Sequence, residues 1–389
     1  MLSIVEARQV SNIVDHSMPA LTGLRGLCAL WVLLYHAWVY VTPEAINYSV
    51  FGQEIRLHVF LSLGWSGVQI LFVLSAFLLT TPYARASAGL APEPRVMSYL
   101  VRRFARVFPA FHIQLLLLIV VAWLFYDQLI VTLEQLPQYL LMLFMPPPMG
   151  IGSPTSINGI WWTLPIELSF YLLLPLIAGL AAWNRKWLLL VLCLVVTCTW
   201  RWYVLDVINP ADKHLWATQL PGSMDSFGMG MLGAIIHVQF TQVRQHSEMY
   251  GKVLGWLLLS TPFIFFGLGH WMAEAFESYW TVSPIMFTWT PVFNAAVVIL
   301  ILNCANNQAS LTRLFGNRWV FYLGTVSYGL YLWHAPIGKW LLNSPWIAQM
   351  EGYQFPRLAL SMLFCSMLAA TLSWFLVEKK VIGLARKVR

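Results

Sequence analysis

Charged residues are scarce in this sequence. Asp, Glu, Lys and Arg make up 10% of the 389 residues and hydrophobic residues make up 59%, whereas roughly a quarter of a soluble globular domain is charged. Apolar runs of about 20 residues recur between short polar loops, and this length crosses the hydrocarbon layer of a membrane as a helix. Helices are the expected element because lipid offers the backbone no hydrogen-bond partner. The composition excludes a soluble protein and predicts an all-α polytopic membrane protein.

Other signals are missing as well. The five cysteines lack the spacing of metal ligands, so we expect small buried side chains and no metal site. The first 19 residues carry Glu6 and Asp15 and lead directly into an apolar span, which predicts an uncleaved anchor in place of a signal peptide. The net charge of +7 is spread over several short loops, so we expect no nucleic-acid partner. The cysteines are Cys28, Cys193, Cys198, Cys304 and Cys365.

The basic residues predict the topology. Most of them follow the even-numbered apolar windows. The loops after odd-numbered windows contain only Arg56, Lys213 and Arg357, and the 127–159 loop contains none. Because short cytoplasmic loops carry the excess of Lys and Arg, this pattern predicts ten spans with both termini in the cytoplasm. We expect one domain over 1–389, with a cytoplasmic segment 1–19 and a basic cytoplasmic tail 379–389. Segment 136–145 is too short to cross and is expected at the interface or as a re-entrant piece. The expected spans are 20–41, 62–81, 108–126, 160–181, 187–205, 220–240, 253–270, 283–303, 319–341 and 357–377.

Ionisable residues inside a span are candidates for function because their insertion is costly. Arg25 and His36 lie eleven residues apart, which returns to within about 20° of the same helical face and separates them by about 16 Å along the axis. Arg201 and Lys339 lie near the outer ends of their spans, where we expect long side chains to reach the headgroups. The pair on the first span is therefore the stronger candidate.

Three groups fall at a similar depth in the outer half of the predicted bundle: His36, Glu167 and His334. A histidine with a near-neutral pKa is suited to take a proton from a hydroxyl, and a carboxylate can orient it. The alternative for each is a structural hydrogen bond to a neighbouring helix or to the backbone. This layer predicts a general acid–base site.

A basic cluster precedes the third span. Arg102, Arg103 and Arg106 lie together, and the last two are three residues apart and share a helical face. Such a cluster can hold phosphates by charge-assisted hydrogen bonds. The alternative is a topology signal that meets anionic lipid.

The first expected span contains the stretch LTGLRGLCALWVLLYHAW, in which ten residues separate Arg25 from His36. Four later stretches follow in order: GVQILFVLSAFLLT with Ser75 and Phe77, RRFARVFPAF, WWTLPIELSFYLLLP with Glu167, and LGTVSYGLYLWHAPI with His334. Together these stretches resemble the membrane acyltransferase-3 family, the sugar and antibiotic O-acyltransferases of bacteria. The resemblance extends over most of the chain.

Three positions depart from the family pattern. Gln69 stands where many members have an acidic residue, Ala76 replaces the usual Gly, and Phe111 replaces a common aromatic hydroxyl. None of them touches the Arg–His signature. They bear on the substrate more than on the chemistry.

The resemblance implies an integral protein of the bacterial inner membrane that moves an acyl group, with acetyl expected, from cytosolic acyl-CoA. The acceptor is a hydroxyl of a sugar, a cell-surface glycan or a glycosylated small molecule. His36, Glu167 and His334 are expected to be catalytic. The expected coenzyme-binding residues are Arg25, Ser75, Arg102, Arg103 and Arg106.

The expected partners are acyl-CoA, the acceptor and membrane lipids. Some relatives of the family carry an additional extracytoplasmic domain. We expect none here, so the protein is expected to act alone or to hand the acyl group to a separate extracytoplasmic partner. The main alternative function is a secondary transporter or flippase of a lipid-linked sugar, in which the same buried groups would relay protons. The lack of an evident inverted repeat weighs against it.

Overall fold

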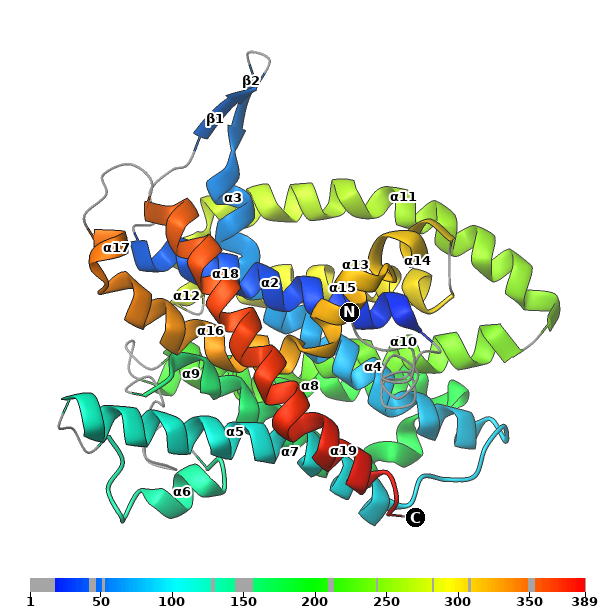
Figure 1. Cartoon of the computed structure of the whole chain (residues 1–389). Coiled ribbons are helices and arrows are strands. Elements are labelled where there is room, and N and C mark those ends of the chain that lie inside the picture. The colour runs from blue at the N-terminus through cyan, green and yellow to red at the C-terminus, as the bar shows by residue number, and fades with distance from the viewer. Residues whose placement is uncertain are drawn as a thin grey trace. The chain divides into compact units, whose positions relative to one another are not determined.

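The computed structural model describes residues 18–41, 47–50, 53–126, 130–143, 157–208, 213–242, 244–281, 283–306, 309–348 and 354–388. In these ranges the elements are helices, apart from an antiparallel hairpin of β1 (Asn47–Val50) and β2 (Gln53–Arg56) (Figure 1). The predicted all-α polytopic class is therefore confirmed. The chain divides into two compact units, which are described separately.

Unit 1 comprises 1–44, 95–165 and 318–389. Its centre is a group of packed helices formed by both ends of the chain, in which α2, α15, α16 and α18 contact one another (Figure 1). The buried core between them includes Leu33, Leu330 and Met362. The elements of unit 1 are α2 (Pro19–Val41), α5 (Val96–Tyr126), α6 (Leu136–Leu140), η3 (Gly159–Trp162), α15 (Arg318–Thr325), α16 (Ser327–Leu342), α17 (Pro345–Ala348), α18 (Gln354–Ser373), the π-helical turn η7 (Trp374–Glu378) and α19 (Lys379–Ala385).

Glycines let α2 approach α15 closely. A Cβ on Gly324 would lie 1.9 Å from the Thr22 carbonyl oxygen, and one on Gly26 would lie 2.5 Å from the Gly324 nitrogen. Membrane helices commonly meet through small residues because van der Waals packing drives their association. The small residues fix the first helix of unit 1 against α15.

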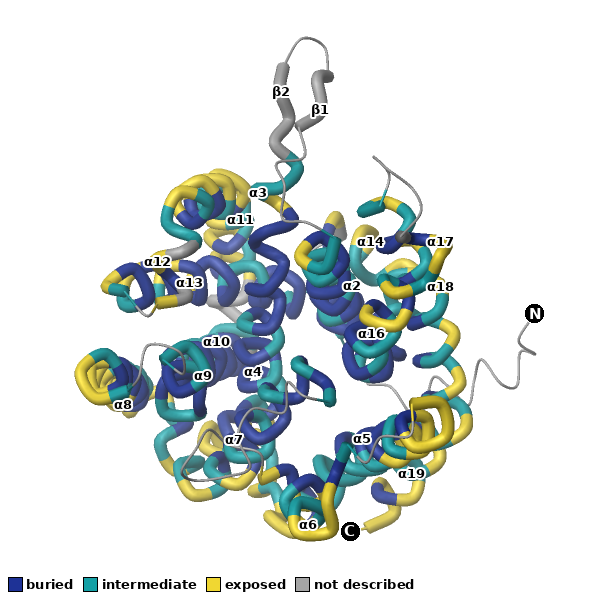
Figure 2. The backbone as a smooth tube through the Cα atoms, turned by 90° about the vertical axis from the view of Figure 1, so that its left-hand side faces the viewer, coloured by how far each residue is buried: buried dark blue, intermediate teal, exposed yellow. Residues whose placement is uncertain are grey.

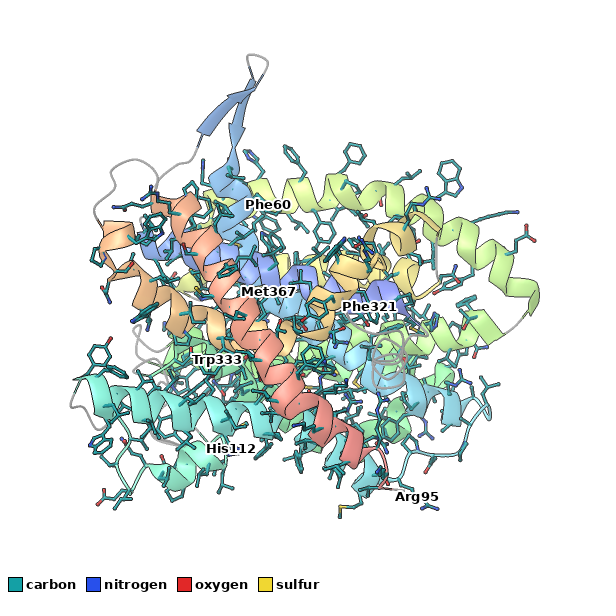
Figure 3. All side chains as sticks on the ribbon, viewed as in Figure 1. Phe60, Arg95, His112, Phe321, Trp333 and Met367 are labelled. Carbon is teal, nitrogen blue, oxygen red and sulfur yellow. The ribbon has the colours of Figure 1, made fainter. Side chains whose placement is uncertain are left out.

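The short helix α6 is attached to α5 by His112 (Figure 3). One ring nitrogen lies 2.7 Å from the Phe108 carbonyl oxygen of the same helix, and the other lies 2.8 Å from that of Leu140. The predicted segment 136–145 thus begins as a short helix beside α5. Its end at 144–145, with the prolines that follow, lies outside the described residues.

Unit 2 comprises 45–94 and 166–317. Its helices α4 and α10 pack most extensively, and a Cβ on Gly230 would lie 2.2 Å from the Val73 carbonyl oxygen. Besides the hairpin, its elements are α3 (Leu57–Ser62), η1 (Leu63–Ser66), α4 (Gly67–Ser87), α7 (Thr163–Ile177, from 166 onward), η4 (Ala178–Leu180), η5 (Trp183–Arg185), α8 (Lys186–Val207), α9 (Lys213–Ala217), η6 (Pro221–Ser223), α10 (Met224–Gln242), α11 (Arg244–Glu274), α12 (Phe276–Trp280), α13 (Ile285–Ala305) and α14 (Ala309–Phe315).

The exposed face of α8 is apolar. The buried residues of this helix recur every three or four positions, at Leu189, Cys193, Thr197, Arg201 and Val204. Large hydrophobic side chains cover the opposite face, and Figure 2 shows exposed residues along one side of this helix. An exposed face of this composition fits lipid in place of water.

Eight helices in the described ranges are long and apolar enough to cross a membrane. The two remaining predicted spans correspond to α10, of 19 residues, and to α15 with α16, of 8 and 16 residues. The chain is therefore an integral membrane protein. The count of ten spans and the cytoplasmic termini stay predictions.

Candidate active site

His36 of α2 and His334 of α16 contact each other in unit 1. The Nδ1 atom of His36 lies 3.3 Å from Nε2 of His334, and the ring centroids are 4.9 Å apart. His334 is fully buried, and His36 is half-buried. The structure thus brings together two of the three residues that share the predicted outer layer.

Backbone carbonyls set the proton positions of this histidine pair. Nδ1 of His36 lies 2.8 Å from the Val32 oxygen, and Nδ1 of His334 lies 2.7 Å from the Tyr331 oxygen. A carbonyl only accepts hydrogen bonds, so each Nδ1 carries a proton when the rings are neutral. Nε2 of His334 then accepts from the shared Nδ1–H of His36. This arrangement leaves the lone pair of a neutral His36 on Nε2.

Glu167 belongs to unit 2, where it contacts two hydroxyl groups. The Ser75 hydroxyl of α4 donates to Glu167 Oε1 at 3.2 Å, and the Tyr171 hydroxyl, one turn along α7, donates to the same oxygen. Two charge-assisted bonds to one oxygen hold the carboxylate in a fixed orientation. Ser75 thus lies beside Glu167, a contact that the sequence did not predict. The place of Glu167 relative to His36 stays a prediction.

The predicted coenzyme residues of unit 1 are on two helices. Arg25 lies in the second turn of α2, and Arg102, Arg103 and Arg106 lie in the N-terminal third of α5. All four side chains are half-buried.

Glu378 was missed by the sequence analysis because it directly precedes the basic residues of the expected tail. It is 2% exposed, and the Ser373 hydroxyl donates to its Oε1 at 2.8 Å. Its carboxylate also interacts electrostatically with Arg106, and η7 and α19 both pack on α5. The π-helical turn at Glu378 is a further signal, because such turns often occur at functional sites. The π-helical turn η7 therefore supplies a buried acid near Arg106 of the basic cluster.

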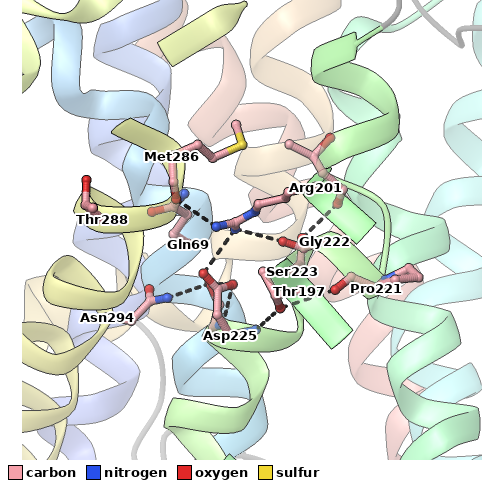
Figure 4. A network of polar contacts seen from close by, with 12 residues as sticks. Gln69, Thr197, Arg201, Pro221, Gly222, Ser223, Asp225, Met286, Thr288 and Asn294 are labelled. Carbon is pink, nitrogen blue, oxygen red and sulfur yellow. Dashed lines mark hydrogen bonds and ion pairs between the residues drawn. The ribbon is translucent and has the colours of Figure 1, made fainter. Parts of the chain in front are cut away.

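The expectation that Arg201 reaches the headgroups is wrong, whereas Lys339 is exposed as expected. The Arg201 side chain is 5% exposed and forms a 3.0 Å ion pair with Asp225, which is fully buried (Figure 4). It also donates to the carbonyl oxygens of Gly222 and Met286, both at 2.8 Å. The ion pair and the two hydrogen bonds to carbonyl oxygens take the place of water around the buried guanidinium. It joins α8, η6, α10 and α13 of unit 2.

Breaking this ion pair is expected to destabilise the protein strongly. Arg201→Ala leaves the Asp225 carboxylate buried and unpaired, which costs about 3–5 kcal/mol. The melting temperature of the purified protein in detergent measures this loss. Lys252→Ala is the control, because it removes an exposed ion pair with Glu248 at 2.8 Å, and such pairs contribute little. Equal melting temperatures for the two variants would contradict a structural role for Arg201.

Metal ligation has no support in the described ranges. They contain no group of three or more His, Cys, Asp or Glu side chains that could hold a metal ion. Cys28, Cys193 and Cys304 are buried thiols in helices.

Comparison with known proteins decides the family. The acyltransferase-3 family, described as an acyltransferase domain, matches residues 18–377, and this range contains both histidines and the basic cluster. The chain belongs to this family. No solved structure matches it.

Two relatives illustrate the range of the family. Nodulation protein 10 of Rhizobium leguminosarum bv. viciae is 25% identical over 93% of this chain and 92% of its own length. Peptidoglycan O-acetyltransferase OatA of Listeria monocytogenes is 23% identical over 82% of this chain. The match covers 49% of OatA, so this membrane acyltransferase spans about half the length of that relative.

Proposed function

We propose that this membrane acyltransferase transfers an acyl group, with acetyl expected, from cytosolic acyl-CoA to a hydroxyl of a sugar, a cell-surface glycan or a glycosylated small molecule. The main supporting observation is the contact between His36 and His334. Hydrogen bonds use Nδ1 of both rings and Nε2 of His334, so Nε2 of His36 keeps its lone pair for a proton. Membership in the acyltransferase family and the name of OatA support O-acyl transfer.

In the proposed reaction His36 acts as the general base. Its Nε2 takes the proton of the acceptor hydroxyl as the oxygen attacks the thioester carbonyl carbon. The carbon–oxygen bond forms, the carbon–sulfur bond breaks, and the coenzyme thiolate receives the proton from the His36 imidazolium. His334 stabilises this cation by accepting the Nδ1–H. Glu167 is proposed to orient His36 or the acceptor, and Ser75 to contact the acyl donor.

The donor would enter from the cytoplasmic side. Arg25, Arg102, Arg103 and Arg106 are proposed to bind its phosphates, since guanidinium groups match phosphate geometry. The buried Glu378 carboxylate would add a negative charge near Arg106 without contacting the ligand. The proposed location is the bacterial inner membrane, and the proposed recipient is either the glycan itself or a separate extracytoplasmic acyl carrier.

The test is an acyl-transfer assay with purified protein in detergent. Acetyl-CoA labelled in the acetyl group is incubated with oligosaccharides of N-acetylglucosamine, and the sugar fraction is counted. Label on the sugar, removable by mild base as expected of an ester, supports the proposal. A transporter has no compartments to exchange between in detergent and would leave the sugar unlabelled. Absence of label from a panel of glycans and from membrane glycolipids would reject O-acyl transfer to sugars.

Removing the basic cluster is expected to affect donor binding more than turnover. Arg103→Ala and Arg106→Ala each remove charge-assisted bonds to phosphate, so the KM for acetyl-CoA should rise about tenfold or more. The kcat should change little, because these bonds are remote from the thioester and equal in ground and transition states. Arg357→Ala is the control, since Arg357 stacks on Trp346 with its guanidinium carbon 4.6 Å from the ring centroid. An unchanged KM with a lower kcat would show that the arginines act elsewhere.

A further inference from the structure

The turn of α16 that presents His334 contains an unusual backbone acceptor. In an α-helix the N–H of residue 336 would donate to the carbonyl of residue 332. Residue 336 is a proline, which has no N–H, so the Leu332 carbonyl loses its helical donor. Leu332 is fully buried, and a buried carbonyl needs another donor.

Two amide side chains supply the missing donors. Nε2 of Gln114, on α5, donates to the Leu332 oxygen at 2.5 Å, and Nδ2 of Asn158, just before η3, donates to it at 3.2 Å. Both side chains are buried, at 0% and 1% exposure. The carbonyl that Pro336 releases is therefore bound by residues from two other segments of unit 1.

The orientation of the Gln114 amide is fixed as well. The indole Nε1–H of Trp161 donates to Gln114 Oε1 at 2.8 Å. An indole nitrogen only donates, so the oxygen of the amide must face Trp161 and its NH₂ group must face Leu332. The Trp161 and Leu332 hydrogen bonds therefore determine which end of the Gln114 amide faces each partner.

The same turn is held at its other end by Tyr331. Its hydroxyl lies 3.1 Å from the Thr163 hydroxyl and 3.1 Å from the Ile160 carbonyl oxygen. The Tyr331 carbonyl in turn accepts from Nδ1 of His334. The turn that carries His334 is thus bound on both sides by buried hydrogen bonds.

We infer that Gln114 is a positioning residue for the His36–His334 pair, acting on His334 through the Leu332 carbonyl. This inference rests on the proposed function. Without the Gln114 amide, the turn from Tyr331 to His334 loses one of the two side-chain donors to the Leu332 carbonyl. His334 then shifts relative to His36 Nδ1, and misplacement of a reacting group by about 1 Å can cost about 10²-fold in rate.

The experiment is a double-mutant cycle on kcat for acetyl transfer. Gln114→Met keeps the length of the side chain and removes both hydrogen bonds, and it should lower kcat about tenfold or more in the wild-type background. In the His334→Ala background it should lower kcat by less than about twofold, because residues that act through one another are not additive. The KM for acetyl-CoA should stay unchanged in both backgrounds.

Tyr322→Phe is the matched control. It removes a 2.9 Å hydrogen bond to Thr371 between α15 and α18 of the same unit, away from the His334 turn. It should lower the melting temperature as Gln114→Met does and leave kcat within about twofold. If Gln114 has a purely structural role, Gln114→Met would lower stability, and its effect on kcat would be the same with His334 present or replaced by alanine.

Two results would overturn the inference: an equal fall of kcat in both backgrounds, or a folded Gln114→Met protein with wild-type kcat. If Gln114→Met does not fold, Trp161→Phe replaces it, because phenylalanine keeps an aromatic ring, smaller than the indole, at this buried position and lacks the N–H that orients Gln114. Its cycle with His334→Ala is read in the same way. Failure of wild-type protein to transfer label would reject the proposed function, whereas failure of the cycle with active wild type rejects only the role of Gln114.

Discussion

Replacing His36 with alanine is expected to lower acyl transfer by about a hundredfold or more, because general bases typically contribute about 10²–10⁴-fold. The change removes the only nitrogen of the pair that the two backbone carbonyls and the partner ring leave with a lone pair. The protein should still fold, since the close approach of Gly26 on α2 to Gly324 on α15 is left unchanged. The measurement is kcat with labelled acetyl-CoA, together with the melting temperature.

His270→Ala is the matched control for this experiment. His270 lies on α11 with its side chain 64% exposed and pairs with Glu274 at 3.3 Å. Its loss should leave kcat unchanged. Retention of more than about a tenth of the activity by His36→Ala would rule out a general-base role, since a loss of less than about tenfold is far smaller than the contribution of a general base.

The sequence predicted the features that depend on periodicity and depth. Hydropathy was sufficient for the membrane class, because span length follows from bilayer thickness. Depth counted from the ends of the spans placed His36 and His334 in one layer, and the structure brings them together. Both predictions depend only on distances along a helix axis, which sequence spacing determines.

The sequence did not predict contacts that depend on which helices are neighbours. Arg201 and Asp225 lie 24 residues apart on different helices, and nothing in their spacing indicates that they form an ion pair. Gln114 is neutral, so the cost of inserting an ionisable group into the membrane does not single it out. Pro336 gave a usable signal, since a proline inside a span always leaves a carbonyl four residues earlier in need of a donor. That donor can come from any neighbouring helix, so the sequence predicts the need and not the residue.

Replacing His334 with alanine is expected to lower kcat less than replacing His36 does. His334→Ala removes the acceptor of the His36 Nδ1–H but leaves the bond from His36 to the Val32 carbonyl, at 2.8 Å. The tautomer of His36 is therefore kept, and its Nε2 can still take a proton. What is lost is the stabilisation of the imidazolium by a second acceptor. A hydrogen bond to a charged group contributes about 1.5–3 kcal/mol, which predicts a fall in kcat of about 10- to 100-fold.

His334→Gln distinguishes this explanation from a loss of packing. A glutamine carbonyl can accept the His36 Nδ1–H, so this variant should recover part of the activity that His334→Ala loses, whereas leucine fills the space without accepting and should not. The measurement is kcat for the alanine, glutamine and leucine variants. Their melting temperatures are measured as well, so that variants of equal stability are compared. If leucine restores activity as well as glutamine does, His334 acts by filling space between α2 and α16. If glutamine alone restores it, the acceptor at 3.3 Å from His36 is the part of His334 that supports catalysis.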